Sequence, residues 1–148
     1  MFIGEVMDLL IFLFIFAPIT LIFHELGHVI AASFFHIHKI EINLGRGRVV
    51  HSLKWSNIRF ILRFFFIGGA STQIELNSPS IISDRFISLG GPLFNLFIFL
   101  FFFPILDRSP HSIQLFIYFN AWMSIINLIP FRIGTKKSDG WRILETFR

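Results

Sequence analysis

The segment His24-Glu25-Leu26-Gly27-His28 holds the residues best suited to chemistry in this chain of 148 residues. On a helix, His24 and His28 lie one turn apart on the same face, so both imidazoles can bind one zinc ion. The Glu25 carboxylate can then take the proton of a zinc-bound water, whose pKa the metal lowers, and deliver it to a leaving group. The segment therefore predicts metal-assisted peptide hydrolysis with one Zn²⁺ ion and with Glu25 as general base.

The composition around this segment is that of a membrane protein. Hydrophobic residues make up 54% of the chain, charged residues only 15%, and 22 residues are Phe, which is too apolar for a soluble domain. Ionisable side chains are costly inside a membrane span and usually mark function, so a metal site is favoured over a chance match. Because the chain has no cysteine, disulfide scaffolds, thiolate zinc sites and cysteine nucleophiles are excluded.

Three apolar blocks are long enough to act as membrane spans, at about residues 9–35, 86–106 and 113–130. A signal peptide is a poor alternative for the first block, because Glu5 and Asp8 precede it where positive charge would be expected. We therefore expect an all-α polytopic membrane protein with a core of three transmembrane helices. Residues 1–148 would form a single membrane-embedded metalloprotease domain.

The region between the first two blocks has its own pattern. Residues 45–66 are rich in β-branched and aromatic side chains, with a turn candidate at Ser56-Asn57, which favours a small β-hairpin or a re-entrant segment. Arg59 and Arg63 are four residues apart, so an amphipathic helix on the membrane surface is the alternative. The pair Gly68-Gly69 ends the apolar run and marks a turn or a close backbone approach.

The basic residues predict an orientation in the cell membrane. With three spans, twelve of the 13 Lys and Arg residues fall on one side, and only Arg108 falls on the other. The positive-inside rule then places the N-terminus outside and the C-terminus in the cytoplasm, with the active site nearer the cytoplasmic side. The same distribution makes lipid headgroups, and not nucleic acid, the expected anionic neighbours of a chain with a net charge of +4.

A metal held by two histidines needs a third protein ligand, which leaves a fourth position for water. The soluble metzincin pattern is excluded because Ala31 and Phe34 stand where it requires Gly and His. Since the histidines lie late in the first span, the candidates are acids on the cytoplasmic side. These are Glu41, Glu75, Asp84, Asp139 and Glu145. From position alone Asp139 ranks level with the others, since it can equally cap a helix over residues 141–147.

Three motifs in order resemble the site-2 protease family of intramembrane zinc metalloproteases. They are the HExxH segment in the first span, Gly91-Pro92-Leu93-Phe94-Asn95 in the second, and Asn127-Leu128-Ile129-Pro130 followed by Asp139-Gly140 after the third. Together they cover the chain from Leu9 to about Arg142. The resemblance implies that His24, His28 and Asp139 bind zinc and that Glu25 is the catalytic base.

The resemblance also implies roles for two asparagines and raises the expectation of a hairpin after the first span. Asn127 becomes a catalytic candidate that orients substrate or stabilises the oxyanion. Asn95 is better assigned to close helix packing, together with Gly91-Pro92. One feature departs from the family, because the eight residues between Pro130 and Asp139 form a longer and more basic connection than usual.

The leading hypothesis is a zinc-dependent intramembrane endopeptidase that cleaves a transmembrane or membrane-inserted peptide. The alternative is a non-proteolytic membrane protein of the same fold, which acts as an immunity or regulatory factor by binding a partner helix. The small size of the chain and the long Pro130 to Asp139 connection favour that alternative. The sequence does not define the substrate or the oligomeric state.

Overall fold

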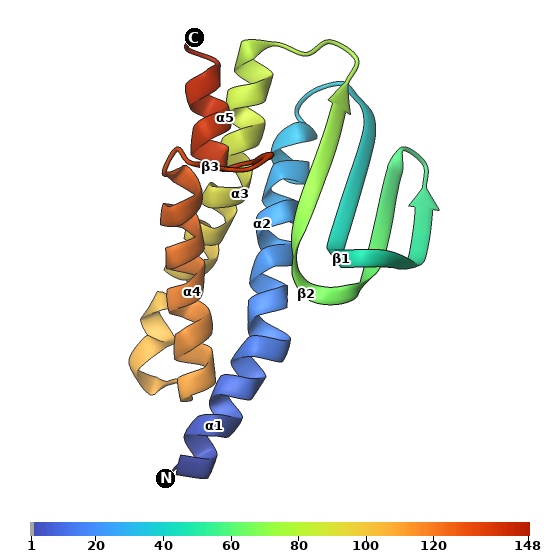
Figure 1. Cartoon of the computed structure of the whole chain (residues 1–148). Coiled ribbons are helices and arrows are strands. Elements are labelled where there is room, and N and C mark those ends of the chain that lie inside the picture. The colour runs from blue at the N-terminus through green and yellow to red at the C-terminus, as the bar shows by residue number, and fades with distance from the viewer. Residues whose placement is uncertain (1) are drawn as a thin grey trace.

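A computed structural model describes residues 2–148, and the side chains of all of these except residues 2 and 66–68. A group of helices carries a long, bent hairpin on one side, and the two termini lie at opposite ends of the molecule (Figure 1). The elements in chain order are α1 (Phe2–Ile11), η1 (Phe12–Phe16), α2 (Ala17–Ala32), β1 (Ile37–Trp55), β2 (Ile58–Leu76), α3 (Ile81–Phe102), η2 (Phe103–Arg108), α4 (His111–Leu128), β3 (Arg132–Ile133), β4 (Lys136–Lys137) and α5 (Asp139–Glu145).

The first helical segment is continuous through α1, η1 and α2, with a stretch of π-helix at η1. Pro18 lies two residues after this stretch, and a proline ring inside a helix clashes with the carbonyl four residues earlier. The π-helical turn, in which the Ala17 N–H donates to the Phe12 carbonyl, is wider than an α-helical turn and lies at the position where the Pro18 ring would clash. The segment therefore reaches the His-Glu-His turns without a break.

Helix α3 runs back along α2, and two glycines let the backbones approach closely. A Cβ added at Gly27 would overlap the Gly90 carbonyl oxygen, and a Cβ added at Gly90 would overlap the Gly27 carbonyl oxygen. Small residues allow such contacts between apolar helices. At the start of α3, Ser80 and Ser83 form a capping box. This packing fixes the HExxH face of α2 against α3.

The hairpin of β1 and β2 folds back on itself because both strands bend. Gly47 and Gly69 lie at these bends with φ of 87° and 115°, a backbone region that favours glycine. As a result, residues 40–44 lie between residues 70–74 on one side and residues 58–62 on the other. The turn falls at Ser56-Asn57, so the expected hairpin is present and the alternative surface helix is not.

The prediction of an all-α protein with three spans is wrong in two respects. Two strands of 19 residues each form a hairpin much larger than a small insert. Within the described chain, only residues 3–32 and 81–108 are long and apolar enough to cross a membrane. Helix α4 fails this test because the polar residues His111, Gln114, Asn120 and Asn127 interrupt its apolar sequence.

The apolar core lies toward the end of the bundle away from α5. Ile98, Leu106, Phe116 and Ile117 are buried together, with partly buried phenylalanines packed around them. Above this core, α4 continues alongside α2 and α3 and leads through β3 and β4 into α5 (Figure 1). The bundle thereby brings α5, at the C-terminal end, close to the HExxH turns of α2.

Candidate metal centre

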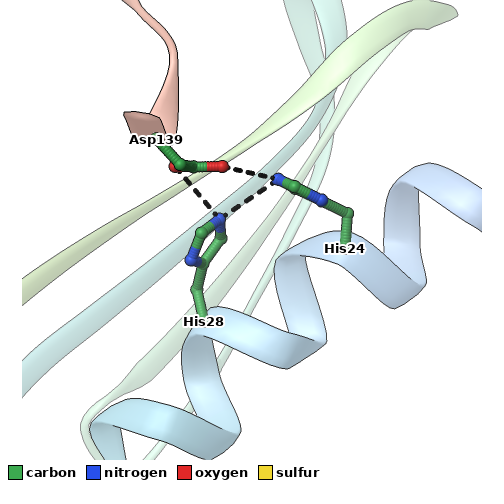
Figure 2. A group of neighbouring side chains, drawn as sticks. All are labelled: His24, His28 and Asp139. Carbon is green, nitrogen blue, oxygen red and sulfur yellow. Dashed lines mark hydrogen bonds and ion pairs between the residues drawn. The ribbon is translucent and has the colours of Figure 1, made fainter. Parts of the chain in front are cut away.

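Three buried side chains meet between α2 and the start of α5 (Figure 2). His24 Nε2 lies 3.0 Å from Asp139 Oδ2, and His28 Nε2 lies 3.5 Å from Asp139 Oδ1. The two Nε2 atoms are 3.3 Å apart. Each of the three residues is at most 8% exposed. The His24 and His28 imidazoles and the Asp139 carboxylate thus face one point and form a triangle, although Asp139 lies 115 residues after His24 in the sequence.

The spacing of these donor atoms suits a zinc ion. In a tetrahedral shell with bonds of about 2.0–2.1 Å, ligand atoms lie about 3.3 Å from one another. The three observed separations, 3.0, 3.3 and 3.5 Å, bracket that value. Nitrogen and carboxylate oxygen are ordinary zinc ligands, and three protein ligands are the number found in catalytic sites. The donor set and its geometry therefore fit the metal that the sequence predicts.

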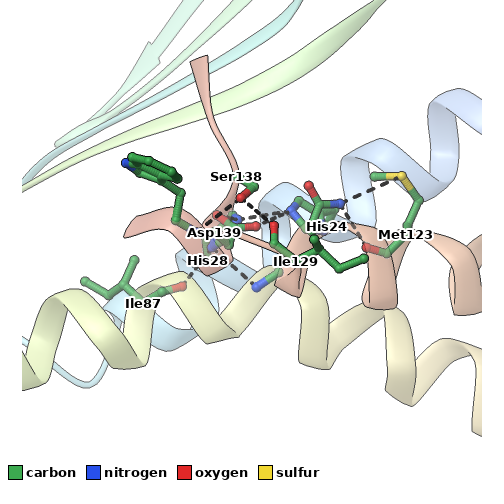
Figure 3. A network of polar contacts seen from close by, with 10 residues as sticks. His24, His28, Ile87, Met123, Ile129, Ser138 and Asp139 are labelled. Carbon is green, nitrogen blue, oxygen red and sulfur yellow. Dashed lines mark hydrogen bonds and ion pairs between the residues drawn. The ribbon is translucent and has the colours of Figure 1, made fainter. Parts of the chain in front are cut away.

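Hydrogen bonding at Nδ1, the His28 ring nitrogen that faces away from Asp139, fixes the orientation of this imidazole. His28 Nδ1 lies 2.7 Å from the Ile87 carbonyl oxygen, close enough for Nδ1–H to donate (Figure 3). The Gly91 N–H approaches the same nitrogen at 3.3 Å, but a protonated Nδ1 cannot also accept. With the proton on Nδ1, Nε2 keeps its lone pair for a metal, an arrangement common in metal sites.

Gly91 in α3 lies directly against the imidazoles. A Cβ built on Gly91 would lie 2.5 Å from His28 Nε2 and 2.7 Å from His24 Nε2. Any side chain at this position would occupy the space in front of the nitrogens that face Asp139. The sequence predicted a helix-packing role for Gly91, whereas the atoms nearest to an added Cβ belong to the two imidazoles, so the requirement for glycine comes from the site.

Asp139 is held by a hydrogen-bonded clasp at the base of the long connection from α4. Ser138 Oγ donates to the Ile129 carbonyl at 2.7 Å and accepts from the Phe131 N–H at 3.0 Å (Figure 3). It also caps α5 by accepting from the Trp141 N–H at 3.1 Å. The Ser138 N–H donates to the Phe131 carbonyl, so residues 131 and 138 meet. Residues 132–137 form a small hairpin that projects from this clasp.

Two further contacts hold α5 in place. A Cβ on Gly140 would overlap the Leu128 carbonyl oxygen, which shows how closely α5 approaches the end of α4. At the other end of α5, the Arg85 guanidinium donates to Thr146 Oγ1 and lies 3.7 Å from the centre of the Phe147 ring. The long connection therefore does not prevent Asp139 from reaching the histidines.

The charge state of Asp139 suits a metal ligand. Burial alone would raise the pKa of this carboxyl, but the adjacent His24 and His28 imidazoles hold that pKa well below its usual range. The carboxylate is accordingly ionised throughout the physiological pH range. A buried carboxylate facing two imidazoles offers the negative charge that a divalent cation needs.

We expect Ser138→Ala to weaken zinc binding without unfolding the protein. The change removes the cap of α5 and two hydrogen bonds that position Asp139, and outer-shell changes of this kind cost roughly 10- to 100-fold in metal affinity. Competition with a chromophoric chelator measures the effect. Ser138→Thr keeps the hydroxyl and should keep the affinity. Lys137→Gln, which removes only the exposed ion pair with Glu145, is the neighbouring control and should change little.

The other predicted residues lie outside this triangle. Glu25 is buried at 8% exposure and forms no hydrogen bond within the described chain. Asn127 donates to the Met123 carbonyl one turn back, at 2.9 Å, and is not part of the cluster. Asn95 is fully buried in the bundle, and neither atom of its amide has a partner among the described residues.

The remaining acidic candidates for the third ligand have other surroundings. Glu41 and Glu75 both lie 3.8 Å from Lys39, and Glu145 pairs with Lys137. Asp84 lies in the first turn of α3. Among the described residues, the group able to hold a metal ion consists of His24, His28 and Asp139.

Sequence reasoning missed two contributors to this site. Ser138 had a usable signal, since a serine before Asp-Gly at a helix start is a strong N-cap candidate. The Ile87 carbonyl had none, because any residue supplies the same backbone oxygen. Its role depends only on how α3 lies against α2.

Paired imidazoles one helical turn apart, a carboxylate that completes the triangle and an adjacent glutamate are the groups that metallohydrolases use. Here they lie among apolar helices. The sequence model described as Peptidase family M50 matches residues 11–110, which is more than half of the chain. The chain belongs to this family, the site-2 protease family, and the resemblance predicted from the motifs is confirmed.

Members of this family are intramembrane zinc metalloproteases. The matched range contains the HExxH and Gly-Pro motifs but ends before Asn127 and Asp139. A search of curated proteins finds no match to the chain.

Proposed function

We propose that this chain is a zinc-dependent intramembrane endopeptidase that hydrolyses a peptide bond in a transmembrane or membrane-inserted substrate. The observation that carries the proposal is the triangle of His24, His28 and Asp139, in which the two Nε2 atoms lie 3.3 Å apart and each lies 3.0 or 3.5 Å from one of the two Asp139 carboxylate oxygens. Its dimensions match one tetrahedral zinc ion, and its two histidines lie on the helix that also carries Glu25. Family membership supports the same activity.

The proposed chemistry divides between the metal and the side chains. When bound, zinc would lower the pKa of water and polarise the scissile carbonyl. Glu25 would accept the proton at a carboxylate oxygen and later donate it to the leaving amine. Its burial at 8% exposure strengthens its electrostatic interactions and limits access of bulk water. Asn127 would steady the substrate carbonyl once its amide leaves the Met123 carbonyl.

A groove next to α2 suits an extended substrate. A mainly apolar pocket of about 390 Å³ lies between α2 and the hairpin, lined in part by Pro18, Leu21, Leu44 and Leu62. β2 pairs with β1 through residues 70–76, and β2 also contacts α2. A substrate helix must unwind locally before cleavage because its carbonyls are bonded internally. Such an unwound segment would lie in the groove and add to the hairpin as a strand.

The position of the charges supports an orientation in the cell membrane. The C-terminus and both ends of the hairpin lie at one end of the helices, and the N-terminus lies at the other (Figure 1). We infer that the C-terminal end faces the cytoplasm, since basic residues gather in the hairpin and the tail. The active site would then open nearer the cytoplasmic side of a single embedded domain spanning residues 1–148.

The non-proteolytic alternative loses one of its supports. The long Pro130 to Asp139 connection favoured it, but the Ser138 clasp accommodates those residues while Asp139 reaches the histidines. A helix-binding factor without catalysis would have no need of a buried carboxylate beside the triangle. The two functions differ in their response to metal removal.

Removal of metal tests the proposed function directly. We expect purified protein to contain one zinc per chain and to cleave a membrane-inserted peptide in detergent. Treatment with 1,10-phenanthroline should abolish cleavage, and added zinc should restore it, because the triangle supplies the ligands that hold the ion. Elemental analysis and mass spectrometry of the products measure both steps. Cleavage that continues in fully metal-free protein would contradict the proposal.

A further inference from the structure

A second polar pocket lies at the far side of the hairpin, away from the metal centre. It has a volume of about 500 Å³ and is formed where the tip of the hairpin meets the start of β1. No acidic residue lines it. Its polar lining residues are His38, Lys39, Lys54, Ser56, Asn57 and Arg59.

The fold-back of the hairpin creates this pocket and makes it well defined. The Ile40 N–H donates to the Asn57 carbonyl at 2.9 Å, which ties the tip to the beginning of β1. Residue 58 lies opposite both Trp55 and Ile40. The start of β1, the tip of the hairpin and the start of β2 therefore meet at this pocket. Figure 1 shows the tip pointing back toward the end of the molecule at which β1 begins.

Two positive charges are placed against each other in this pocket. Lys54 lies directly opposite Arg59 on neighbouring strands, and both are exposed. Like charges in this position destabilise a hairpin unless an anion lies between them. Lys39 adds a third cation, although Glu41 and Glu75 each lie 3.8 Å from it. Glu41 lies opposite Arg59 on its other side, whereas the residue opposite Lys54 is Arg59 itself.

The pocket also lies at the level where a membrane surface is expected. β1 begins five residues after α2 ends, and β2 ends five residues before α3 begins. These are the ends of the two segments that can cross a membrane. Trp55 beside the pocket is 76% exposed, and exposed tryptophan is typical of the headgroup region. The charges therefore face the depth at which lipid phosphates lie.

We propose that this pocket binds a phosphate group, which either an anionic phospholipid headgroup or a soluble phosphate can supply. The Arg59 fork and the Lys54 ammonium would donate to its oxygens, with the Ser56 hydroxyl and the Asn57 amide available beside them. Binding relieves the repulsion between the two cations and fixes the hairpin tip against β1. The inference does not depend on the proposed protease activity.

Calorimetric titration of the full chain in dodecyl maltoside tests the proposal. The probes are dihexanoyl phosphatidylglycerol, dihexanoyl phosphatidylcholine and inorganic phosphate. We expect phosphatidylglycerol or inorganic phosphate to bind, and Lys54→Gln and Arg59→Gln each to weaken that binding by about tenfold, as for loss of a charged hydrogen bond. Arg48→Gln is the matched control, since Arg48 is an exposed hairpin cation outside the pocket lining.

The arms of the experiment separate the two sources. Binding of phosphatidylglycerol alone identifies a lipid site, and binding of inorganic phosphate identifies a site for soluble phosphate. The proposal is overturned if neither probe binds, if phosphatidylcholine binds equally well, or if Arg48→Gln has the same effect as the pocket variants. Without ligand, Lys54→Gln should unfold at no lower temperature than the parent, because it removes a repulsive pair.

Discussion

Glu25→Gln should leave zinc bound while reducing peptide cleavage by about 10²- to 10⁴-fold, the usual contribution of a general base. Glu25 lies outside the triangle of possible ligands, so the amide should not disturb His24, His28 or Asp139. Glutamine has nearly the same volume as glutamate but cannot take up a proton at neutral pH. Zinc content and the initial rate of cleavage, measured on the same preparation, check the prediction.

His24→Ala provides the contrast to this variant. It removes one of the three possible ligands, so zinc affinity should fall by more than the roughly 10- to 100-fold typical of outer-shell changes. Activity should disappear together with the metal. If Glu25→Gln retained full cleavage, Glu25 could not be the base. If that variant also lost zinc, its role would be structural.

The parts of the site that could be predicted are those fixed within one helix. His24 and His28 converge because four residues make about one turn, wherever α2 lies in the protein. Asp139 is different, since it lies 115 residues from His24 and its approach depends on the Ser138 clasp. The irregular connection before it has no periodicity from which its path could be read. Only the resemblance to known motifs placed Asp139 above the other acids.

The fold was predicted less well, for two physical reasons. The polar residues of α4 are spread along an otherwise apolar helix, so the block is long enough to span but is less apolar than the two candidate spans. In the hairpin, Gly47 and Gly69 were visible in the sequence, but the positive φ angles that they adopt where β1 and β2 bend were not. The fold-back that creates the polar pocket at the hairpin tip could not be inferred from alternation alone.

The second large effect is expected from Gly91→Ala, which alters no ligand. The added methyl would lie 2.5 Å from His28 Nε2 and 2.7 Å from His24 Nε2, inside the space a zinc ion would share. Both contacts are with the far ends of side chains, which can rotate away. We therefore expect the protein to fold while zinc affinity falls at least about 100-fold, beyond the outer-shell range. Competition with a chelator and thermal unfolding of the metal-free protein measure the two quantities.

Gly90→Ala is the matched control, one residue away on the same helix. Its methyl would meet the Gly27 carbonyl oxygen, which is backbone and cannot move aside without separating α2 from α3. That change should lower the unfolding temperature of the metal-free protein, as overpacking costs about 1–3 kcal/mol. Gly91→Ala should not lower it. Zinc affinity equal to the parent in Gly91→Ala would show that the metal, if bound, is not held by the inward-facing nitrogens of His24 and His28.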